Sequence, residues 1–543
     1  MRIWRAAFAA AGLAAALQQP SEAATPVEIG AWTQPFSLPL IAMHAAMLPT
    51  GKVLLYSADH GVPGVEAWLL DPVSMALQEV PPPWYPACSG HSFLGDGRLL
   101  VTGGQVGTEN PPIGTMQCHI FNPFTEQWTR IEDMVHGRWY PSNITLADGR
   151  VVTFSGLDEY GDFNPDIELW DPRGTNNWQL LGQKILETYP CLHLLTNGLV
   201  FRSGPDGRTE TYNITNNVWT VIAIRNVTGR FDAPSVMVPP NPNRIMMMGG
   251  NSRTNQPNNS AEIIDLSSPT PQWTYTTPMN FVRMDFNAAI LPNGKILVVG
   301  GRTNYLPTAV YALTPEIYDP QTATWTMVAP HQIPRWYHST AILLPDGRVL
   351  AAGSDNEPSG EIYSPPYLFQ GTRPVIQSAP GVLVYGQSFS LSFTSATANN
   401  RVALIRNSCV THSVNMDQRY VRLADLTSGS GTFTVPGPAT ANLAPPGYYM
   451  LYVIDQNGIP SVSASVHVLP EPLKILEARR AGSGYIQLFW SLNFADATVQ
   501  TSDSLIPPGT WTSQPGSPTT QQGRYTITVP ATSNPTFFRL SSP

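Results

Sequence analysis

The chain repeats one short pattern seven times, and this repeat limits its possible folds more than any other feature. Each unit has an apolar run, a turn, and a second apolar run that often ends in Gly-Gly. Asp-Gly and Asn-Gly turns between apolar runs favour tight β-hairpins, because a type I′ turn needs positive φ. The turn positions follow at intervals of 46 to 53 residues: Gly51, Gly97, Gly149, Gly198, Arg244, Gly294 and Gly347.

A second hairpin is expected after the first in every unit, for example in EIYDPQTATW and, in the last unit, EIYSPPYLF. Two hairpins make a four-stranded sheet. Seven such sheets, at about 50 residues each, predict a seven-bladed kelch-type β-propeller. We place it at residues 24–369. The fifth unit, which has Arg244 in place of the turn glycine, has the weakest pattern.

The composition agrees with an all-β fold and excludes one class of function. The chain of 543 residues holds 43 Gly, 53 Pro and 14 Trp, a mixture typical of short strands joined by tight turns. Only 13% of residues are charged and the net charge is −8. A nucleic-acid-binding protein that works through a basic face is therefore excluded.

Two further β units are expected after the propeller. Residues 370–469 hold short β runs without the repeat and are typical of a β-sandwich of immunoglobulin-like size. Residues 470–543 indicate a second, small C-terminal β-sandwich, which we interpret as a spacer or attachment module rather than part of a site.

The N-terminus is typical of a secretory leader. Arg2 and Arg5 precede an apolar run, and the small-residue cleavage site Ser21-Glu22-Ala23 follows. We expect residues 1–23 to be a signal peptide and the mature protein to be secreted, with no membrane-spanning segment. In an oxidising compartment, the simplest prediction for Cys88, Cys118, Cys191 and Cys409 is two disulfides.

Chemically active side chains share one position in the repeat. Cys88, Tyr140 and His338 each lie nine residues before a turn glycine, and Tyr337 is adjacent to His338. Residues at the same offset should lie at the same rim of the axial channel, so a thiol, two phenols and an imidazole are expected to converge there. His412 lies on a polar hairpin tip of the following sandwich, where a core histidine would be unusual.

Each of these residues has a simpler explanation on its own. Propellers of this kind often carry structural histidines near this strand, and His44, His91 and His193 lie at loosely similar places. Tyr140 alone would be an ordinary rim aromatic. Imidazole combined with phenolate, however, is a ligand set that suits Cu(II).

Several motifs carry a resemblance to a known family. The segments CSGHS, RWYPS, RWYHSTAILLPDGR, THSVNMDQR and PGYYMLYVIDQNGIPS are similar to the galactose oxidase and glyoxal oxidase family of mono-copper radical oxidases. The resemblance covers roughly residues 30–469 and matches five site positions in order. It implies that residues 370–469 form the early set β-sandwich of that family.

The resemblance implies a role for each matched residue. Tyr140, His338 and His412 match equatorial ligands of one copper ion, and Tyr337 matches the axial tyrosine and general base. Cys88 matches the cysteine whose sulfur is bonded to the ring of Tyr140, which gives a thioether radical cofactor. At most one disulfide then remains among the other three cysteines, with Cys409 as a candidate partner.

The sequence departs from the family at one position. Galactose oxidase stacks a tryptophan on the thioether from the loop that here reads SGLDEYGDFNP, which has no tryptophan. Candidates to replace it are Tyr160, Phe163, Trp139 and Trp336. Tyr189 and Arg302 are further candidates for the substrate pocket, because of where their strands begin.

These observations predict a secreted, monomeric copper oxidase. It would convert a primary alcohol, small aldehyde or carbohydrate to an aldehyde or acid, reducing dioxygen to hydrogen peroxide. Two alternatives stay open: a non-catalytic kelch propeller that binds glycan or protein at the cell surface, and a copper enzyme that cross-links matrix through introduced aldehydes. If His412 is a ligand, we expect the sandwich to dock on the face that carries Tyr140 and His338.

Overall fold

The computed structural model describes residues 24–58, 65–106, 113–173, 178–252, 256–306, 308–470, 474–491, 497–504, 511–521, 524–531 and 536–541. The leader expected over residues 1–23 lies outside the described residues. Across the described ranges, no helix is long and apolar enough to cross a membrane. Regular structure there is almost entirely β, apart from the short helix α1 (Pro26–Ile29) and the 3₁₀ helix η1 (Pro366–Leu368).

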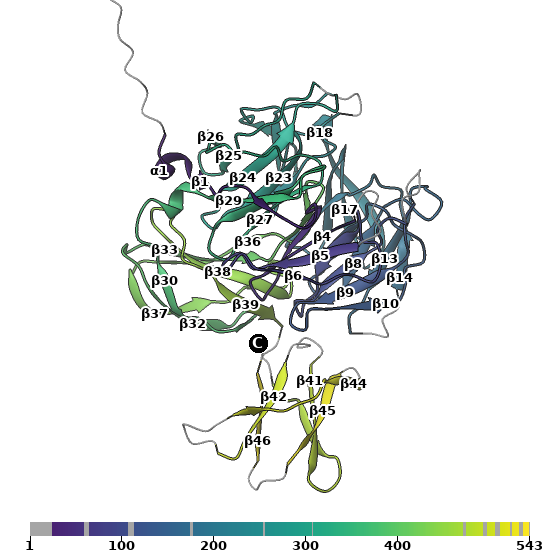
Figure 1. Cartoon of the computed structure of the whole chain (residues 1–543), viewed down its shortest axis with the longest axis vertical. Helices are drawn as coiled ribbons and strands as arrows, with labels where there is room; N and C mark the ends of the chain where they lie inside the picture. Colours follow the sequence, from purple (N-terminus) through teal and green to yellow (C-terminus); the bar gives the residue numbers. More distant parts are fainter. Residues whose placement is uncertain are drawn as a thin grey trace, which may run out of the picture.

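Seven antiparallel sheets follow one another along the chain (Figure 1). In the first six, the four strands of each unit pair in sequence order. The strands of the seven sheets are β3 (His44–Met47), β4 (Val53–Ala58), β5 (Val65–Leu70), β6 (Leu77–Glu79); β7 (Gly90–Phe93), β8 (Leu99–Thr102), β9 (Cys118–Asn122), β10 (Gln127–Ile131); β11 (Ser142–Thr145), β12 (Val151–Phe154), β13 (Asp166–Trp170), β14 (Trp178–Gln183); β15 (Cys191–Leu194), β16 (Val200–Gly204), β17 (Asp206–Asn213), β18 (Val218–Gly229); β19 (Ser235–Met237), β20 (Arg244–Met248), β21 (Ala261–Asp265), β22 (Thr274–Thr276); β23 (Met284–Ile290), β24 (Ile296–Arg302), β25 (Glu316–Asp319), β26 (Thr324–Met327); and β27 (Ser339–Leu343), β28 (Val349–Gly353), β29 (Ser359–Ser364), with β1 (Ala31–Trp32) and β2 (Phe36–Ser37).

Burial follows the order of the strands within a sheet. Every residue of β7, β11 and β15 is buried, whereas β6 is exposed throughout. First strands of neighbouring sheets contact each other, as β7 does β11 and β23 does β27. The first strands therefore form the centre of this body.

The turn glycine is required on two grounds at Gly97. Its φ is 87°, a left-handed value that a side chain disfavours. A Cβ there would also lie 2.7 Å from the ring of Tyr448. The fifth unit, where Arg244 replaces the glycine, still forms its four strands, β19 to β22.

The seventh sheet differs from the prediction. We expected a second hairpin within EIYSPPYLF, but the outer strands are β1 and β2, which pair with β29. Pro365 and Pro366 follow β29 directly, and a proline has no N–H to donate to a ladder. The N-terminal segment therefore completes the last sheet and links the two ends of the repeat region.

The next unit is a sandwich of two sheets. Its core includes Leu391, Phe393, Val402, Leu404, Leu451 and Val453, all fully buried. The strands are β30 (Val375–Ser378), β32 (Ser388–Thr394) and β37 (Ser430–Pro436) in one sheet, and β31 (Val382–Val384), β39 (Ala464–Leu469), β38 (Gly447–Asp455), β33 (Asn400–Arg406) and β36 (Tyr420–Leu426) in the other.

The prediction that the sandwich docks on the face carrying Tyr140 and His338 is wrong. The sandwich lies on the Asp-Gly turns, where His467 Nε2 donates to Gly95 O at 2.6 Å and Ser463 N donates to Pro345 O at 2.9 Å. These turns are at the opposite end of the first strands from Tyr140 and His338. One hairpin explains how His412 still reaches those residues.

That hairpin consists of β34 (Cys409–Thr411) and β35 (Val414–Asn415). It adds to β3, with His44 paired to Thr411, and β34 or β35 also contacts β7, β19, β23 and β27. The hairpin therefore runs between the first strands, through the centre of the body, and brings its tip to the far end.

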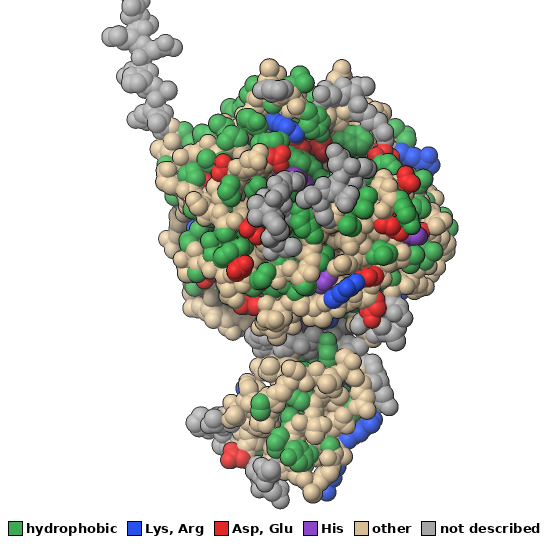
Figure 2. Space-filling model, turned by 45° about the vertical axis from the view of Figure 1, so that its right-hand side comes forward, with side chains coloured by type: hydrophobic (Ala, Val, Ile, Leu, Met, Phe, Trp, Pro, Cys, Tyr) green, Lys and Arg blue, Asp and Glu red, His purple; other side chains and the backbone are tan. Residues whose placement is uncertain are grey.

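A third unit lies below the other two in Figure 1, reached by the chain after β39. Leu488, Trp490 and Val529 are buried in its core together with Leu469 of β39. Its strands are β40 (Glu477–Arg480), β41 (Tyr485–Ser491), β45 (Arg524–Pro530) and β44 (Thr519–Gln521) in one sheet, and β43 (Thr512–Ser513), β42 (Thr498–Ser502) and β46 (Phe537–Ser541) in a second. Figure 2 shows charged side chains scattered over the visible face rather than gathered in a patch of one sign.

Candidate metal centre

Six residues with left-handed backbone conformation mark the entries to the first strands of six sheets. A non-glycine residue with positive φ is uncommon, and six at equivalent positions indicate a shared design. We call these residues the entry ring: Cys88 (φ 58°), Tyr140 (66°), Tyr189 (44°), Asp232 (55°), Asp285 (57°) and His338 (65°).

The main chain joins neighbouring members of the entry ring. Tyr140 N donates to Cys88 O at 2.9 Å, and Tyr189 N donates to Tyr140 O at 2.8 Å. Asp285 N donates in the same way to Asp232 O at 2.8 Å. These sheet-to-sheet bonds hold the strand entries at fixed spacing, which gives the side chains of the ring defined positions.

Buried arginine–glutamate pairs hold the strand entries from behind. Arg138, two residues before Tyr140, pairs with Glu168 at 2.7 Å, and both side chains have no exposure. Its guanidinium also donates to Ser155 O at 2.8 Å, so the charge pair is hydrogen-bonded as burial requires. The same arrangement recurs in the later sheets, as Arg230–Glu262, Arg283–Glu316 and Arg335–Glu361.

The seventh sheet has one extra residue between its arginine and its ring member. Arg138 and Arg283 lie two residues before the ring position, whereas Arg335 lies three before His338. The additional residue is Tyr337, so this entry presents two functional side chains. This one-residue insertion in the seventh repeat explains why a phenol and an imidazole come from adjacent positions.

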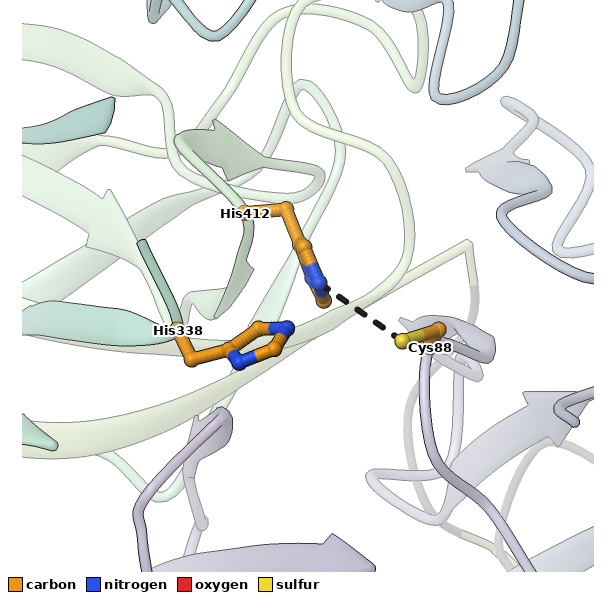
Figure 3. A group of neighbouring side chains, drawn as sticks. All are labelled: Cys88, His338 and His412. Carbon is orange, nitrogen blue, oxygen red and sulfur yellow. Dashed lines mark hydrogen bonds between the residues drawn. The ribbon is translucent and has the colours of Figure 1, made fainter. Parts of the chain in front are cut away.

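The five site residues predicted from the sequence lie together. The phenol oxygens of Tyr140 and Tyr337 are hydrogen-bonded to each other. The ring centroids of His338 and His412 are 4.8 Å apart, and that of Tyr337 is 5.2 Å from His412. Cys88 Sγ is 3.6 Å from His412 Nε2 (Figure 3).

Hydrogen bonds orient the imidazole of His412. Thr411 Oγ1 donates its only hydrogen to Met43 O at 3.0 Å, so at 2.6 Å from His412 Nδ1 it can only accept. The hydrogen of His412 therefore lies on Nδ1, and Nε2 presents its lone pair to the centre. The backbone at the hairpin tip is left-handed at His412 and Ser413, which turns the ring inward.

His338 is oriented by a carboxylate. Asp355 Oδ1 lies 2.5 Å from His338 Nδ1, which favours the tautomer with its hydrogen on that atom. A carboxylate behind a histidine is a common support for a metal ligand. Figure 3 shows the imidazoles of His338 and His412 and the sulfur of Cys88 directed at the same space.

Burial keeps the donor groups neutral in the absence of a cation. Desolvation is the largest effect, lowering the pKa of His412 well below its usual value and raising the pKa of both Tyr140 and Tyr337. The pKa of the Cys88 thiol rises to about 12 for the same reason. A bound cation would supply the positive charge that phenolates need here.

The donor set fits copper. A potential ligand atom of each of Cys88, His338 and His412 lies within 4.8 Å of the other two. Two imidazoles and two phenol oxygens are nitrogen and oxygen donors of the kind that Cu(II) takes in tetragonal geometry. The residues present therefore fit a mononuclear copper site.

Two protein-family models match this chain. The glyoxal oxidase N-terminus family matches residues 83–367, and the galactose oxidase-like early set domain matches residues 373–468. The chain belongs to the galactose oxidase and glyoxal oxidase family.

Several relatives in this family are named for their oxidase activity. The chain is 28% identical to galactose oxidase of Gibberella zeae, over 81% of this chain and 71% of the relative. It is 29% identical to aldehyde oxidase GLOX of Vitis pseudoreticulata, over 70% of this chain and 82% of the relative. A solved fungal alcohol oxidase in complex with copper aligns with a TM-score of 0.73 and 27% identity, over 81% of this chain and all of that structure.

Trp139 stacks on the ring of Tyr140. Their ring centroids are 4.0 Å apart at an interplanar angle of 32°. Of the other candidates for the missing family tryptophan, Tyr160 is 77% exposed and Phe163 is 43% exposed, and Trp336 lies under the guanidinium of Arg302. Trp139 is therefore the candidate that covers the phenol.

The histidines considered structural are buried beside the first strands. His44 Nε2 accepts from Cys88 N at 3.1 Å, and its ring stacks on Tyr56 at 4.3 Å. Tyr56 in turn bonds His91 Nδ1 at 2.5 Å. His44 supports the main chain of Cys88 rather than joining the donor set.

The prediction of two disulfides is wrong. Cys88, Cys118, Cys191 and Cys409 are all free and buried. Cys409, the candidate disulfide partner, lies with its Sγ 3.0 Å from Asp417 Oδ2. Cys118, Cys191 and Cys409 lie on strands of different sheets, and Cys88 lies in the turn before β7. Each is buried as an unpaired thiol.

The sequence reasoning missed two members of the entry ring, Asp232 and Asp285. Asp285 lies nine residues before Gly294, the same offset as Cys88, Tyr140 and His338, so the signal was present. The pocket candidate Tyr189 shares that offset, and its ring lies 4.8 Å from Tyr140 and 4.9 Å from His412. Arg302 pairs with Asp285 at 2.6 Å.

Proposed function

We propose that the protein is a copper radical oxidase that converts a primary alcohol or small aldehyde to an aldehyde or acid and reduces dioxygen to hydrogen peroxide. The observation that carries this proposal is the convergence of Cys88, Tyr140, Tyr337, His338 and His412 from two structural units. Family membership supports it, since relatives are named galactose oxidase and aldehyde oxidase.

The scaffold in this proposal is a seven-bladed kelch-type propeller at residues 24–369. The seven successive sheets and the contacts between their first strands support it. The early set sandwich would span residues 370–469, and its central hairpin would supply His412. Residues 470–543 would form a separate C-terminal sandwich that has no part in the site.

Tyr140, Tyr337, His338 and His412 would hold the copper ion through two phenol oxygens and two imidazole nitrogens. The inward-directed Nε2 lone pair of His412 and the hydrogen bond between the two phenols support this assignment. Asp355 and Thr411 would orient the two imidazoles from outside. Copper, when bound beside a tyrosyl radical, would supply a centre that takes two electrons from the substrate.

Cys88 and Tyr140 would form the thioether. One S–C bond forms, the S–H bond of Cys88 and a ring C–H bond of Tyr140 break, and two electrons and two protons pass to dioxygen. Their packing in one cluster with Met43 and Trp139 supports this step. The cross-linked ring then holds its radical under the indole of Trp139.

Two tyrosines would divide the work on the substrate. Tyr337 accepts the hydroxyl proton as general base, and the cross-linked Tyr140 takes a hydrogen atom from the adjacent carbon. The substrate would thereby be oxidised by two electrons to the carbonyl product, and dioxygen would be reduced to hydrogen peroxide. The leader-like segment at residues 1–23 would direct the protein out of the cell. The secreted protein would be a monomer.

A peroxide-release screen of the copper-loaded protein against primary alcohols and aldehydes tests this function. We expect peroxide that depends on both copper and substrate, with the copper-free and zinc-loaded protein as controls. A protein that binds copper but releases no peroxide above these controls with any alcohol or aldehyde would instead favour a non-catalytic binding role.

A further inference from the structure

The entry ring has an acidic side that the proposed chemistry does not use. Asp232 and Asp285, which we call the acidic pair, enter from neighbouring sheets and are joined through their main chains at 2.8 Å. Asp285 is 3% exposed. Asp232 is partly exposed, so it is the member that a ligand can reach.

One buried carboxylate oxygen of the acidic pair has no hydrogen-bond partner. Asp285 Oδ2 accepts from Arg302 Nε at 2.6 Å, but Asp285 Oδ1 is buried without a hydrogen-bond partner. Buried polar atoms are normally satisfied, and an exception indicates an absent ligand or water. Asp232 Oδ2 accepts from the hydroxyl of Tyr305, whose ring is 46% exposed.

The two carboxylates of the acidic pair outnumber the cations that contact them. Among the described side chains that contact the acidic pair, Arg302 is the single cation, against two carboxylates. Its guanidinium is held in place between the rings of Trp336, at 4.2 Å, and Tyr305, at 4.7 Å. The two carboxylates therefore exceed the guanidinium by one formal negative charge, and burial together with the charge of Asp232 raises the pKa of Asp285 to about 7. A cationic ligand would favour the ionised form of Asp285.

The acidic pair lies beside the strand entry that carries Tyr337 and His338. Strand β23, which contains Asp285, contacts β27, and Arg302 joins Asp285 to Trp336. Trp336, which lies under Arg302, is the residue before Tyr337. A substrate whose hydroxyl reaches Tyr337 would have its other end near this side of the ring.

We propose that the acidic pair binds a hydrogen-bond donor on the substrate, so that the enzyme prefers primary alcohols with an ammonium group over neutral diols and rejects alcohols with a carboxylate. This inference rests on the proposed oxidase function and names its substrate class. A charge-assisted hydrogen bond to a carboxylate is stronger than a neutral one, and a carboxylate ligand would meet two like charges.

Three alcohols of nearly equal size test the order of preference: 2-aminoethanol, 1,2-ethanediol and glycolate. We expect kcat/KM to fall in that order, by about tenfold at each step, because a hydrogen bond to a charged group is stronger than a neutral one. Asp232→Asn keeps the shape and removes the charge, so it should shrink the difference between 2-aminoethanol and glycolate about tenfold. Asp425→Asn, an exposed acid on the sandwich, changes net charge equally and should leave the order unchanged.

A binding measurement separates this inference from the oxidase proposal. In saturation-transfer NMR on the copper-free protein, 2-aminoethanol should receive signal from the wild type and lose most of it with Asp232→Asn. Binding without peroxide release would keep this inference and overturn the oxidase. Oxidation of all three alcohols with equal kcat/KM would overturn the inference and keep the oxidase, and the wild-type series decides this even if a variant fails to fold.

Discussion

The entry ring has two halves that share a backbone and differ in chemistry. Cys88, Tyr140 and His338, which we propose for the copper site, form what we call the metal-binding half, and Asp232 and Asp285 form the acidic half. Tyr189, the sixth member, follows Tyr140 in chain order. Both halves use the same left-handed entry, the same sheet-to-sheet hydrogen bonds and the same buried arginine–glutamate pairs. Side chains at one repeated position therefore decide function, while the repeat supplies the geometry.

Removing the sulfur should have the largest effect on the metal-binding half. Cys88→Ser cannot form the thioether, so we expect peroxide release to fall to background while copper still binds. Optical spectra and peroxide assays of the copper-loaded variant measure this. Normal turnover by Cys88→Ser would remove the distinction between the two halves, whereas Asp232→Asn should keep the radical absorption.

Removing the proposed base should have the next largest effect. Tyr337→Phe should keep the thioether and its absorption but lose turnover by roughly 10²–10⁴-fold, the usual contribution of a positioned base. The measurement is kcat by peroxide assay beside the optical spectrum of the same sample. A native rate in Tyr337→Phe would contradict the assignment of the proton to that oxygen.

Removing the glutamate from a buried arginine–glutamate pair should destabilise the protein equally in the two halves. Glu168→Gln leaves Arg138 buried without its partner, and Glu316→Gln does the same to Arg283. Each should lower the free energy of unfolding by about 3–5 kcal/mol, measured by urea denaturation. The exposed control Asp425→Asn should change it by less than about 1 kcal/mol. A large cost in one half alone would show that the halves are built differently.

Replacing the indole that covers the proposed radical should have the smallest effect. Trp139→Phe keeps an aromatic face on Tyr140 but loses the indole, and stacking of this kind contributes about 0.5–1.5 kcal/mol. We expect the radical absorption to decay a few-fold faster, up to about tenfold. Trp336→Phe, on the acidic side, should leave the decay unchanged. Equal decay in both variants would place the cover elsewhere.

Local patterns in the sequence predicted the repeat and most of the metal-binding half. The offset of nine residues from a turn glycine identified Cys88, Tyr140 and His338, because each turn fixes the length of its hairpin. Asp285 obeys the same rule, and its offset from Gly294 was a sufficient signal for it. Asp232 could not be found in this way, since it lies twelve residues before Arg244 in the unit without a turn glycine.

Long-range contacts were beyond the reach of these patterns. The pairing of β1 with β29 joins segments more than 300 residues apart, and nothing local signals it beyond the prolines that stop β29. The docking face of the sandwich was wrong because the prediction assumed that His412 must come from the near side. A hairpin threaded between first strands reaches the same point from the far side.

The mass of the protein tests the central claim most directly. Copper-loaded, aerated protein should be about two mass units lighter than the reduced copper-free form, because the thioether removes two hydrogens. Digestion should then give a peptide that joins Cys88 to Tyr140 and that reductant does not separate. An unchanged mass, with Cys88 recovered as a free thiol after exposure to copper and air, would contradict the account.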